Sequence, residues 1–233
     1  MISSVLFGAF GILLVIGAPI TVALGMAAMV AFMSIGKDVT TMVQIAYNSV
    51  NSFPVMALPA FILSGALMQG SGISRRLVEI AETMAGNMSG GLATSTVIAC
   101  MFFGAISGSG PATTAAVGML MIPAMVKRGY DKDYASAITA SSGGLGIVIP
   151  PSIPMVIYGV TASESITQLF IAGILPGFVI ASGIIAMNYF ISRKKGYKSH
   201  VDDWSIKKVL VKIKDGFWAL MAPVVILGGI YSG

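Results

Sequence analysis

Long apolar runs joined by short charged connections make up most of the chain. A helix of roughly 20 apolar residues can cross a membrane. Only 10% of the 233 residues are charged, against about a quarter in soluble domains, so a large soluble core would lack charged outer faces. The pattern therefore predicts an all-α polytopic membrane protein. Six stretches carry no charged residue, and each except the last is long enough to cross: residues 1–36, 39–74, 83–126, 134–163, 165–192 and 216–233.

Three apolar stretches predict single membrane helices, with bends where they contain proline. A mildly polar segment, residues 40–52, is expected at the membrane interface. Residues 217–233 end inside an apolar segment and are expected to begin a further crossing in a longer protein. The three predicted helices are residues 4–35 with Pro19, residues 53–70 with Pro54 and Pro59, and residues 166–191 with Pro176.

Two segments are amphipathic and predict helices that lie along the membrane surface. In residues 73–86, Arg75 and Glu79 share a polar face, while apolar residues such as Leu77 occupy the other face. The basic segment 193–215 also places its apolar residues on one helical face. Those residues are Ile206, Val209, Leu210, Ile213 and Phe217.

The positive residues predict the orientation. Three clusters, at 75–76, 127–132 and 193–214, contain 2 + 3 + 8 = 13 of the 14 Lys and Arg residues. The predicted crossings place all three clusters on one side, which the positive-inside rule assigns to the cytoplasm. The chain is therefore expected in the bacterial inner membrane. Because these residues flank membrane segments, the net charge of +5 gives no reason to expect nucleic acid binding.

Two predicted membrane segments are broken. Residues 89–127 split at GAISGSGPATT, residues 104–114, into halves of about 24 Å. Such halves are too short for a ~30 Å core, so they predict a re-entrant hairpin. Residues 133–160 split likewise, around residues 143–152.

Irregular backbone inside a membrane predicts a binding site, because unsatisfied peptide groups are tolerated only within protein or beside a wet cavity. Ser107 and Ser109 supply hydroxyl oxygens, and Thr113 and Thr114 lie in the first turn of the next half-helix. The charge-free stretches that hold the two breaks, residues 83–126 and 134–163, contain no carboxylate or histidine, and the one histidine, His200, is in the basic linker. This favours sodium over proton coupling. Close helix packing at the small residues and an ordinary inter-helix loop remain alternatives.

Other chemistries do not fit the sequence. No Gly-x-Ser-x-Gly elbow surrounds Ser107 or Ser109, and GGLG lacks the Lys-Ser/Thr of a phosphate-binding loop. The single cysteine, Cys100, excludes an intramolecular disulfide and predicts a packing residue. We expect no enzyme activity and no cofactor.

Three segments together resemble a known family. They are SFPVMALPAFILSGALM, GGLATSTVIACMFFGAISGSGPATTAAVG and GGLGIVIPPSIPMVIYG. In this order they resemble the large membrane subunit (M or DctM-like) of tripartite ATP-independent periplasmic (TRAP) transporters, whose large subunits are about twice as long. The chain looks like the N-terminal half, with one of two inverted repeats and the start of the second.

The resemblance implies an elevator-type transporter that imports organic acid anions with Na+ as coupling ion. Examples are C4-dicarboxylates and sialic acid-type sugar acids. The implied partners are a periplasmic substrate-binding protein, a small membrane subunit of four helices and membrane lipid. Three alternatives remain: an anion transporter that needs no binding protein, an intramembrane serine enzyme, and a purely structural subunit.

The resemblance also implies domains and site residues. The domains are scaffold helices 1–72, an interfacial arm 73–88, a transport hairpin and broken helix 89–162, a scaffold helix 163–192, a basic cytoplasmic linker 193–216 and the start of the next crossing, 217–233. The implied sodium ligands are Ser107, Gly108, Ser109, Gly144, Gly146, Ile149 and Pro150. The implied substrate contacts are Ser109, Gly110, Pro111, Thr113 and Thr114.

Overall fold

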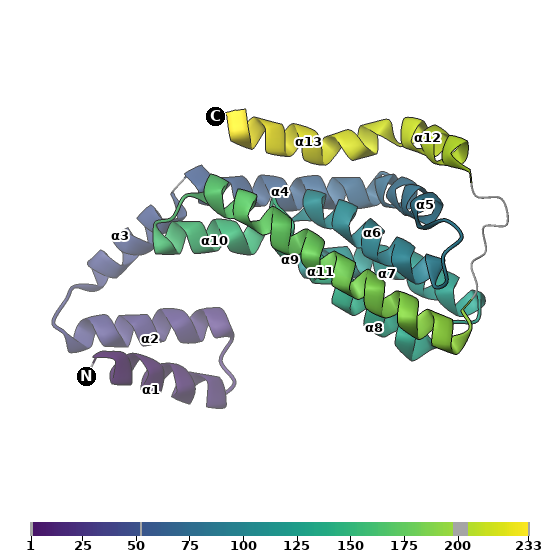
Figure 1. Ribbon diagram of the computed structural model, residues 1–233. Helices are drawn as coiled ribbons and strands as arrows, with labels where there is room; N and C mark the ends of the chain where they lie inside the picture. Colours follow the sequence, from purple (N-terminus) through teal and green to yellow (C-terminus); the bar gives the residue numbers. More distant parts are fainter. Residues whose placement is uncertain (1, 52, 198–204, 233) are drawn as a thin grey trace. The chain divides into compact units, whose positions relative to one another are not determined.

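The computed structural model describes residues 2–51, 53–197 and 205–232. The regular structure of these residues is entirely α-helical (Figure 1), which confirms the predicted all-α class. The chain divides into two compact units, Met1–Met56 and Ala57–Gly233. Residues 198–204 of the predicted linker, His200 among them, lie outside the described residues.

The first unit begins with a helical hairpin where the sequence predicts one helix. Helix α1, Ile2–Val15, ends before Gly17, which has φ +87°, and α2, Ile20–Ser34, begins after Pro19. The two helices pack side by side (Figure 1). The prediction of a single helix over residues 4–35 is therefore wrong, because a left-handed glycine followed closely by a proline reverses the chain there.

The first two helices of the first unit are short compared with the ~30 Å core of a membrane. Helices α1 and α2 have 14 and 15 residues, about 21–23 Å each. Helix α3, Val39–Val50, follows and is capped by Asp38, whose carboxylate accepts from Thr40 N at 3.2 Å. The buried residues of α2 are alanines spaced four apart, which lets neighbouring backbones approach closely. They are Ala23, Ala27 and Ala31.

The second unit surrounds one buried helix. Helix α6 is buried without interruption from Gly91 to Val97 and contacts α5, α7, α8, α9, α11 and α13. The helix bounds are α4, Phe53–Gly70; α5, Ile73–Ala85; α6, Gly91–Ser107; α7, Gly110–Lys127; α8, Lys132–Gly143; α9, Leu145–Val148; α10, Ile153–Ala162; α11, Ile166–Lys195; α12, Ile206–Asp215; and α13, Phe217–Ser232.

Length and composition identify few full crossings in the described part of the chain. Helix α11, with 30 residues, is long and apolar enough to cross a membrane alone. The segment Lys132–Val148 and the helix Ile153–Ala162 are together long and apolar enough to cross a membrane, and they are bent by 41° at their junction. Both predicted breaks are present, since α6 stops at Ser107 and α8 stops at Gly143.

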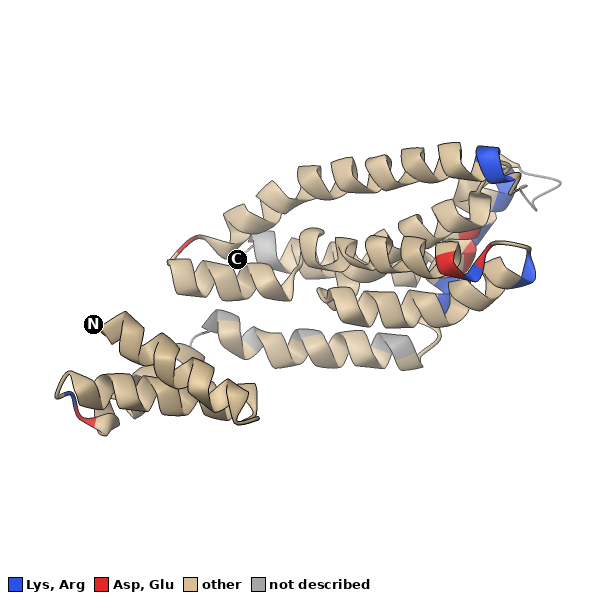
Figure 2. Ribbon diagram, turned by 90° about the horizontal axis from the view of Figure 1, so that it is seen from below, with Lys and Arg blue, Asp and Glu red and all other residues tan. Residues whose placement is uncertain are grey.

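Charge is distributed unevenly over the second unit. Figure 2 shows its Lys and Arg residues gathered at one end, where α7 and α11 finish and α5 and α12 lie. The connection between α10 and α11, which contains Glu164, lies at the other end. The three predicted basic clusters thus share one end. Its cytoplasmic orientation and the six-part division of the chain stay predictions.

Candidate functional site

The first break ends α6 at a glycine. Gly108 follows Ser107 with φ +62°, a conformation that favours glycine. Its N–H still donates to the Gly104 carbonyl at 2.9 Å, which closes the last turn. A Cβ added to Gly108 would lie 2.8 Å from the Pro151 carbonyl oxygen. Both conformation and space therefore require glycine at this position.

The second half of the hairpin starts with a serine cap. Ser109 Oγ accepts from Ala112 N at 3.4 Å, and Pro111 occupies the first turn. Proline suits that turn because its missing N–H would have no partner within the helix. The sequence Ser-Gly-Pro-Ala thus starts α7 with only two residues between the end of α6 and the start of α7.

Three predicted site residues form a compact oxygen cluster at this tip, called here the tip cluster: Ser107, Ser109 and Thr113. Ser107 Oγ lies 3.0 Å from Thr113 Oγ1, and Ser109 N donates to Ser107 Oγ at 3.3 Å. Thr113 Oγ1 donates to the Ser109 carbonyl at 2.7 Å. Thr113 is fully buried and Ser107 nearly so. Each hydroxyl oxygen has two lone pairs, so these bonds leave both oxygens able to coordinate a cation.

A hydrogen bond from the Ser152 side chain stabilises the second break. Helix α9 ends where Ile149 N donates to the Leu145 carbonyl at 2.8 Å. Ser152 Oγ then donates to the Ile147 carbonyl at 2.7 Å. The intervening Pro150–Pro151 peptide bond is cis. Helix α10 begins at Ile153, directly after this turn.

The two breaks touch through their backbones. Ile153 N donates to the Gly108 carbonyl at 3.0 Å. A Cβ added to Gly104 would lie 2.7 Å from Gly146 Cα, and one added to Gly110 would lie 3.3 Å from the Gly143 carbonyl oxygen. Glycine on both sides allows this approach. The tip of the hairpin and the break of the following helix therefore form one continuous site.

The threonines of α7 face the second break. Gly146 packs against Thr113, and Gly143 packs against Thr114. Thr114 Oγ1 donates to its own helix, at the Gly110 carbonyl, at 3.0 Å. Thr114 thus lines the contact between α7 and α8.

Four predicted residues lie less centrally. Gly144 is exposed, and its carbonyl accepts from Ile147 N at 3.2 Å. Pro111 is exposed, whereas Pro150 is buried. The Ile149 side chain packs on α11, since a Cβ added to Gly177 would lie 2.7 Å from Ile149 Cγ1. Their roles in binding stay predictions.

The assembled groups suit a cation better than an anion. Hydroxyl and carbonyl oxygens are neutral ligands of the kind that coordinate Na+ in broken helices. Of the first-turn donors nearby, Ala112 N and Ile153 N already have partners, and Pro111 and Pro154 have no N–H. Within the described ranges, no group of three or more His, Cys, Asp or Glu residues could hold a metal ion. The site is therefore an uncharged, acceptor-rich one.

The buried side-chain amide of Asn188 connects α11 to the α6–α7 hairpin. This residue was not among those predicted from the sequence. Asn188 is fully buried, and its Nδ2 donates to the Gly90 carbonyl at 3.1 Å and to Thr94 Oγ1 at 2.9 Å. Its Oδ1 accepts from Tyr134 OH at 2.7 Å and from Ser192 Oγ at 2.9 Å. The sequence offered one signal for this contact, the amide of Asn188 within an otherwise apolar segment. Such a polar group inside a membrane needs partners. Helices α6, α8 and α11 are joined at this residue.

Aromatic rings and an ion pair reinforce the same end of α11. Lys195 pairs with Asp131 and lowers the pKa of its carboxyl. Tyr197 OH accepts from Asp131 N at 3.2 Å, and its ring stacks on Tyr130 at 4.2 Å between centroids. Burial raises the pKa of Tyr130 to about 12, so this phenol stays neutral. The α7–α8 connection is thus fastened to the end of α11.

Replacement of the buried amide should loosen this junction. Asn188→Ala removes the partner of four hydrogen-bonding groups, and an unsatisfied buried group costs about 1–3 kcal/mol. We expect a Tm several degrees lower in detergent-solubilised protein, measured by intrinsic fluorescence. Ser182→Ala, an exposed position on the same helix, should leave the Tm unchanged. Equal values for both variants would contradict the proposed junction.

Comparisons with known proteins identify the family of the chain. Residues 7–233 match the family described as the tripartite ATP-independent periplasmic transporter, DctM component. The chain is 48% identical to the isethionate TRAP transporter permease protein DctMQ of Oleidesulfovibrio alaskensis, over 98% of this chain and 36% of the relative. It is 41% identical to the C4-dicarboxylate TRAP transporter large permease protein DctM of Pseudomonas aeruginosa, over 80% and 44%.

A third relative is the sialic acid TRAP transporter permease protein SiaT of Haemophilus influenzae. It is 39% identical over 95% of this chain and 36% of its own length. The chain thus spans less than half the length of each of these three relatives. All three are named as permeases rather than enzymes, which agrees with the expected transport role. The chain belongs to the family of DctM components, the large membrane subunits of TRAP transporters.

Proposed function

We propose that the chain forms one half of a sodium-coupled transporter subunit that imports organic anions across the bacterial inner membrane. The main support for this proposal is that the tip cluster packs against the second break, so that neutral oxygens lie close together there. In this proposal Na+ binds between the hairpin tip and residues 143–150. The second half of the complete protein supplies the inverted repeat and a second site.

Sodium is favoured over protons by the placement of the acids. The charge-free stretches around the two breaks, residues 83–126 and 134–163, contain no Asp, Glu or His. A proton relay within a membrane usually uses such groups. Hydroxyl and carbonyl oxygens bind Na+ without titrating, so coupling through the tip cluster would persist over a broad pH range.

Ion binding would organise the two breaks before the anion arrives. Na+ drawn between the hydroxyls of Ser107 and Thr113 and nearby carbonyls would hold the tip against residues 143–150. Ordering the site with one ligand lowers the cost of binding the next. Each positive charge that moves inward through 100 mV supplies about 2.3 kcal/mol, which is enough to accumulate a solute.

We propose an elevator movement in which the boundary of the moving part differs from the predicted one. Asn188 joins α11 to α6 and α8, so we propose that α11 moves with the hairpin and the broken helix. Residues 163–192 would then belong to the transport domain rather than to the scaffold. The α1–α2 hairpin would remain in the scaffold.

The substrate is proposed to be a carboxylate, delivered by a periplasmic binding protein, with a small four-helix subunit as membrane partner. Two relatives named for C4-dicarboxylate and sialic acid support this class. The relative named for isethionate makes an organic sulfonate the second candidate. Contacts are expected at Ser109, Gly110, Pro111, Thr113 and Thr114, with most charged contacts from other parts of the transporter, since donors near the tip are few.

Ion replacement tests the proposal directly. The complete transporter is reconstituted in liposomes with its binding protein, and uptake of radiolabelled solutes is measured in sodium or choline buffer at constant pH. We expect uptake in sodium to exceed uptake in choline at least tenfold. A proton gradient without sodium should not restore uptake. Equal uptake in both buffers would overturn sodium coupling, and uptake without the binding protein would favour an independent transporter.

A further inference from the structure

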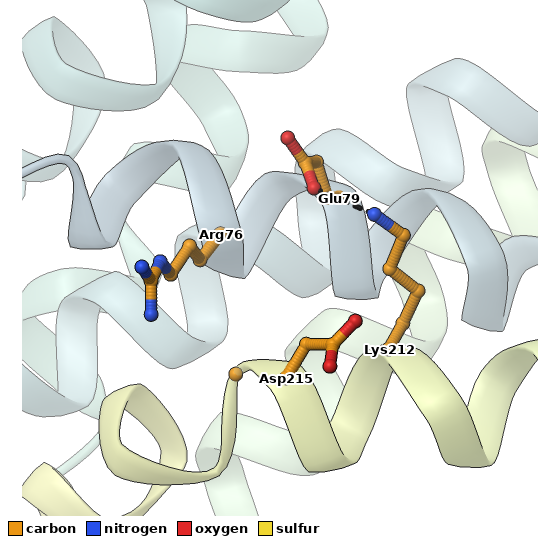
Figure 3. Close-up of a pocket in the computed structure, with 5 residues that line it drawn as sticks. Arg76, Glu79, Lys212 and Asp215 are labelled. Carbon is orange, nitrogen blue, oxygen red and sulfur yellow. Dashed lines mark hydrogen bonds and ion pairs between the residues drawn. The ribbon is translucent and has the colours of Figure 1, made fainter.

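A polar cavity lies between the two amphipathic helices and is lined by none of the residues at the two breaks. It has a volume of about 350 Å³ and is lined by α5 and α12 and the residue after α12 (Figure 3). This volume lies within the usual range for small-molecule sites, about 300–1,000 Å³. The lining residues are Arg76, Glu79, Lys212, Asp215 and Gly216.

The two helices that form the cavity are fixed to each other. Lys212 Nζ lies 2.9 Å from Glu79 Oε2, and Arg75 adds a second ion pair to Glu79 at 3.5 Å. The hydrogen bond from Lys212 lowers the pKa of Glu79, so the pair stays charged at neutral pH. Gly216 packs against Ile80, where an added Cβ would lie 3.3 Å from Ile80 Cγ1. The cavity therefore has a defined shape.

Two opposite charges line the cavity without an ion-pair partner. In the described part of the chain, Arg76 and Asp215 form no ion pair. Figure 3 shows the Asp215 carboxylate beside the Lys212 side chain and the Arg76 side chain directed away from the Glu79–Lys212 pair. Asp215 is also the last residue of α12, where the helix dipole disfavours a negative charge. The helix dipole therefore does not stabilise this carboxylate. Lys212, three residues earlier on the same helix, attracts it, and a bound cationic group would stabilise it further.

Neighbouring residues place the cavity at the level of lipid headgroups. Trp218, two residues beyond the cavity, is 81% exposed, and tryptophan concentrates at membrane interfaces. The exposed apolar residues Leu210 and Val211 on α12 and Phe217 on α13 offer a surface for acyl chains. Basic residues gather at the same end of the unit (Figure 2). The cavity thus opens where a phospholipid can present its headgroup.

We propose that this cavity binds the headgroup of a zwitterionic phospholipid that carries a primary ammonium, as in phosphatidylethanolamine. The Arg76 guanidinium would donate to the phosphate, for which its planar fork is well suited. The Asp215 carboxylate would accept from the ammonium. The four lining charges sum to zero, which matches a neutral zwitterion. A trimethylated ammonium cannot donate hydrogen bonds, and a glycerol headgroup brings no positive charge.

Native mass spectrometry of the complete transporter in detergent tests this site. The probes are phosphatidylethanolamine, phosphatidylcholine and phosphatidylglycerol with identical acyl chains. We expect the wild-type protein to bind phosphatidylethanolamine about tenfold more tightly than phosphatidylcholine, as one charge-assisted hydrogen bond predicts. Asp215→Asn should abolish this difference, and Arg76→Gln should weaken both lipids about tenfold.

Two matched variants keep the result interpretable. Lys207→Gln removes a positive charge from α12 outside the cavity, and Asp133→Asn removes an exposed negative charge from α8. Both should retain the wild-type preference, and all variants should share the wild-type Tm. Equal binding of the ethanolamine and choline lipids by the wild-type protein would overturn the proposal. The proposal would also be overturned if the wild-type protein preferred phosphatidylglycerol and Lys207→Gln abolished that preference. Such a result would indicate non-specific attraction of anionic lipid.

Discussion

Gly104→Ala is expected to reduce uptake at least tenfold while leaving the chain membrane-inserted. The added Cβ would lie 2.7 Å from Gly146 Cα and 3.1 Å from Gly146 N. Both neighbours are backbone atoms, so no side-chain rotation can relieve the contact. Overpacking of this kind typically costs about 1–3 kcal/mol, and here it would separate the hairpin from the second break. We expect uptake to fall at least tenfold and the Tm to fall by several degrees.

Gly183→Ala provides the matched control for this substitution. Gly183 lies within α11, and an added Cβ would meet nothing within 4 Å. Alanine is the better helix former by about 1 kcal/mol, so uptake and Tm should equal or exceed the wild-type values. If Gly104→Ala behaved in the same way, α6 and α9 could not be in the close contact described here.

Removal of the tip-cluster hydroxyls is expected to weaken sodium dependence selectively. Ser107→Ala and Thr113→Val each delete one oxygen of the cluster and leave the apolar packing largely intact. We expect the sodium concentration for half-maximal uptake to rise at least tenfold in each, equivalent to about 1.4 kcal/mol. Thr113→Ser, which restores the hydroxyl, should recover most of the wild-type dependence. The measurement is initial uptake rate against sodium concentration in proteoliposomes.

Ser95→Ala distinguishes ion binding from a general effect of buried serines. Ser95 lies on the same helix as Ser107, is 1% exposed, and its hydroxyl donates to the Gly91 carbonyl at 2.8 Å. Its loss should leave the sodium concentration for half-maximal uptake unchanged. Wild-type sodium dependence in both Ser107→Ala and Thr113→Val would exclude the tip cluster as the sodium site.

Local sequence patterns predicted the breaks well because breaks have local causes. Glycine favours the left-handed conformation that ends a helix, and proline suits the first turn of the next one. The structure separates α6 from α7 at Gly108 and Pro111. The same reasoning failed between residues 4 and 35. There an uninterrupted apolar pattern suggested one crossing, although Gly17 and Pro19 were sufficient to reverse the chain.

Partnerships between distant residues could not be predicted from the sequence. Nothing local indicates that Gly104 faces Gly146, or that Asn188 bonds to Gly90 and Thr94. These contacts depend on how helices pack, and the apolar faces of α6 and α11 offer many similar arrangements. The structure brings the predicted residues Ser107, Ser109 and Thr113 together at the hairpin tip, and their roles in binding stay predictions. The positions of Gly144 and Ile149 depended on packing that only the structure reveals.

The bond between Ile153 N and the Gly108 carbonyl has a consequence for how such transporters can diversify. Because it joins main chain to main chain, almost any residue at position 153 can keep it, and only proline would remove the donor. Side chains around the two breaks are thus free to change with the solute, while the joint between them is retained. If the two breaks bind ion and solute as proposed, new solute preferences can arise by substitution without rebuilding the contact between the two breaks.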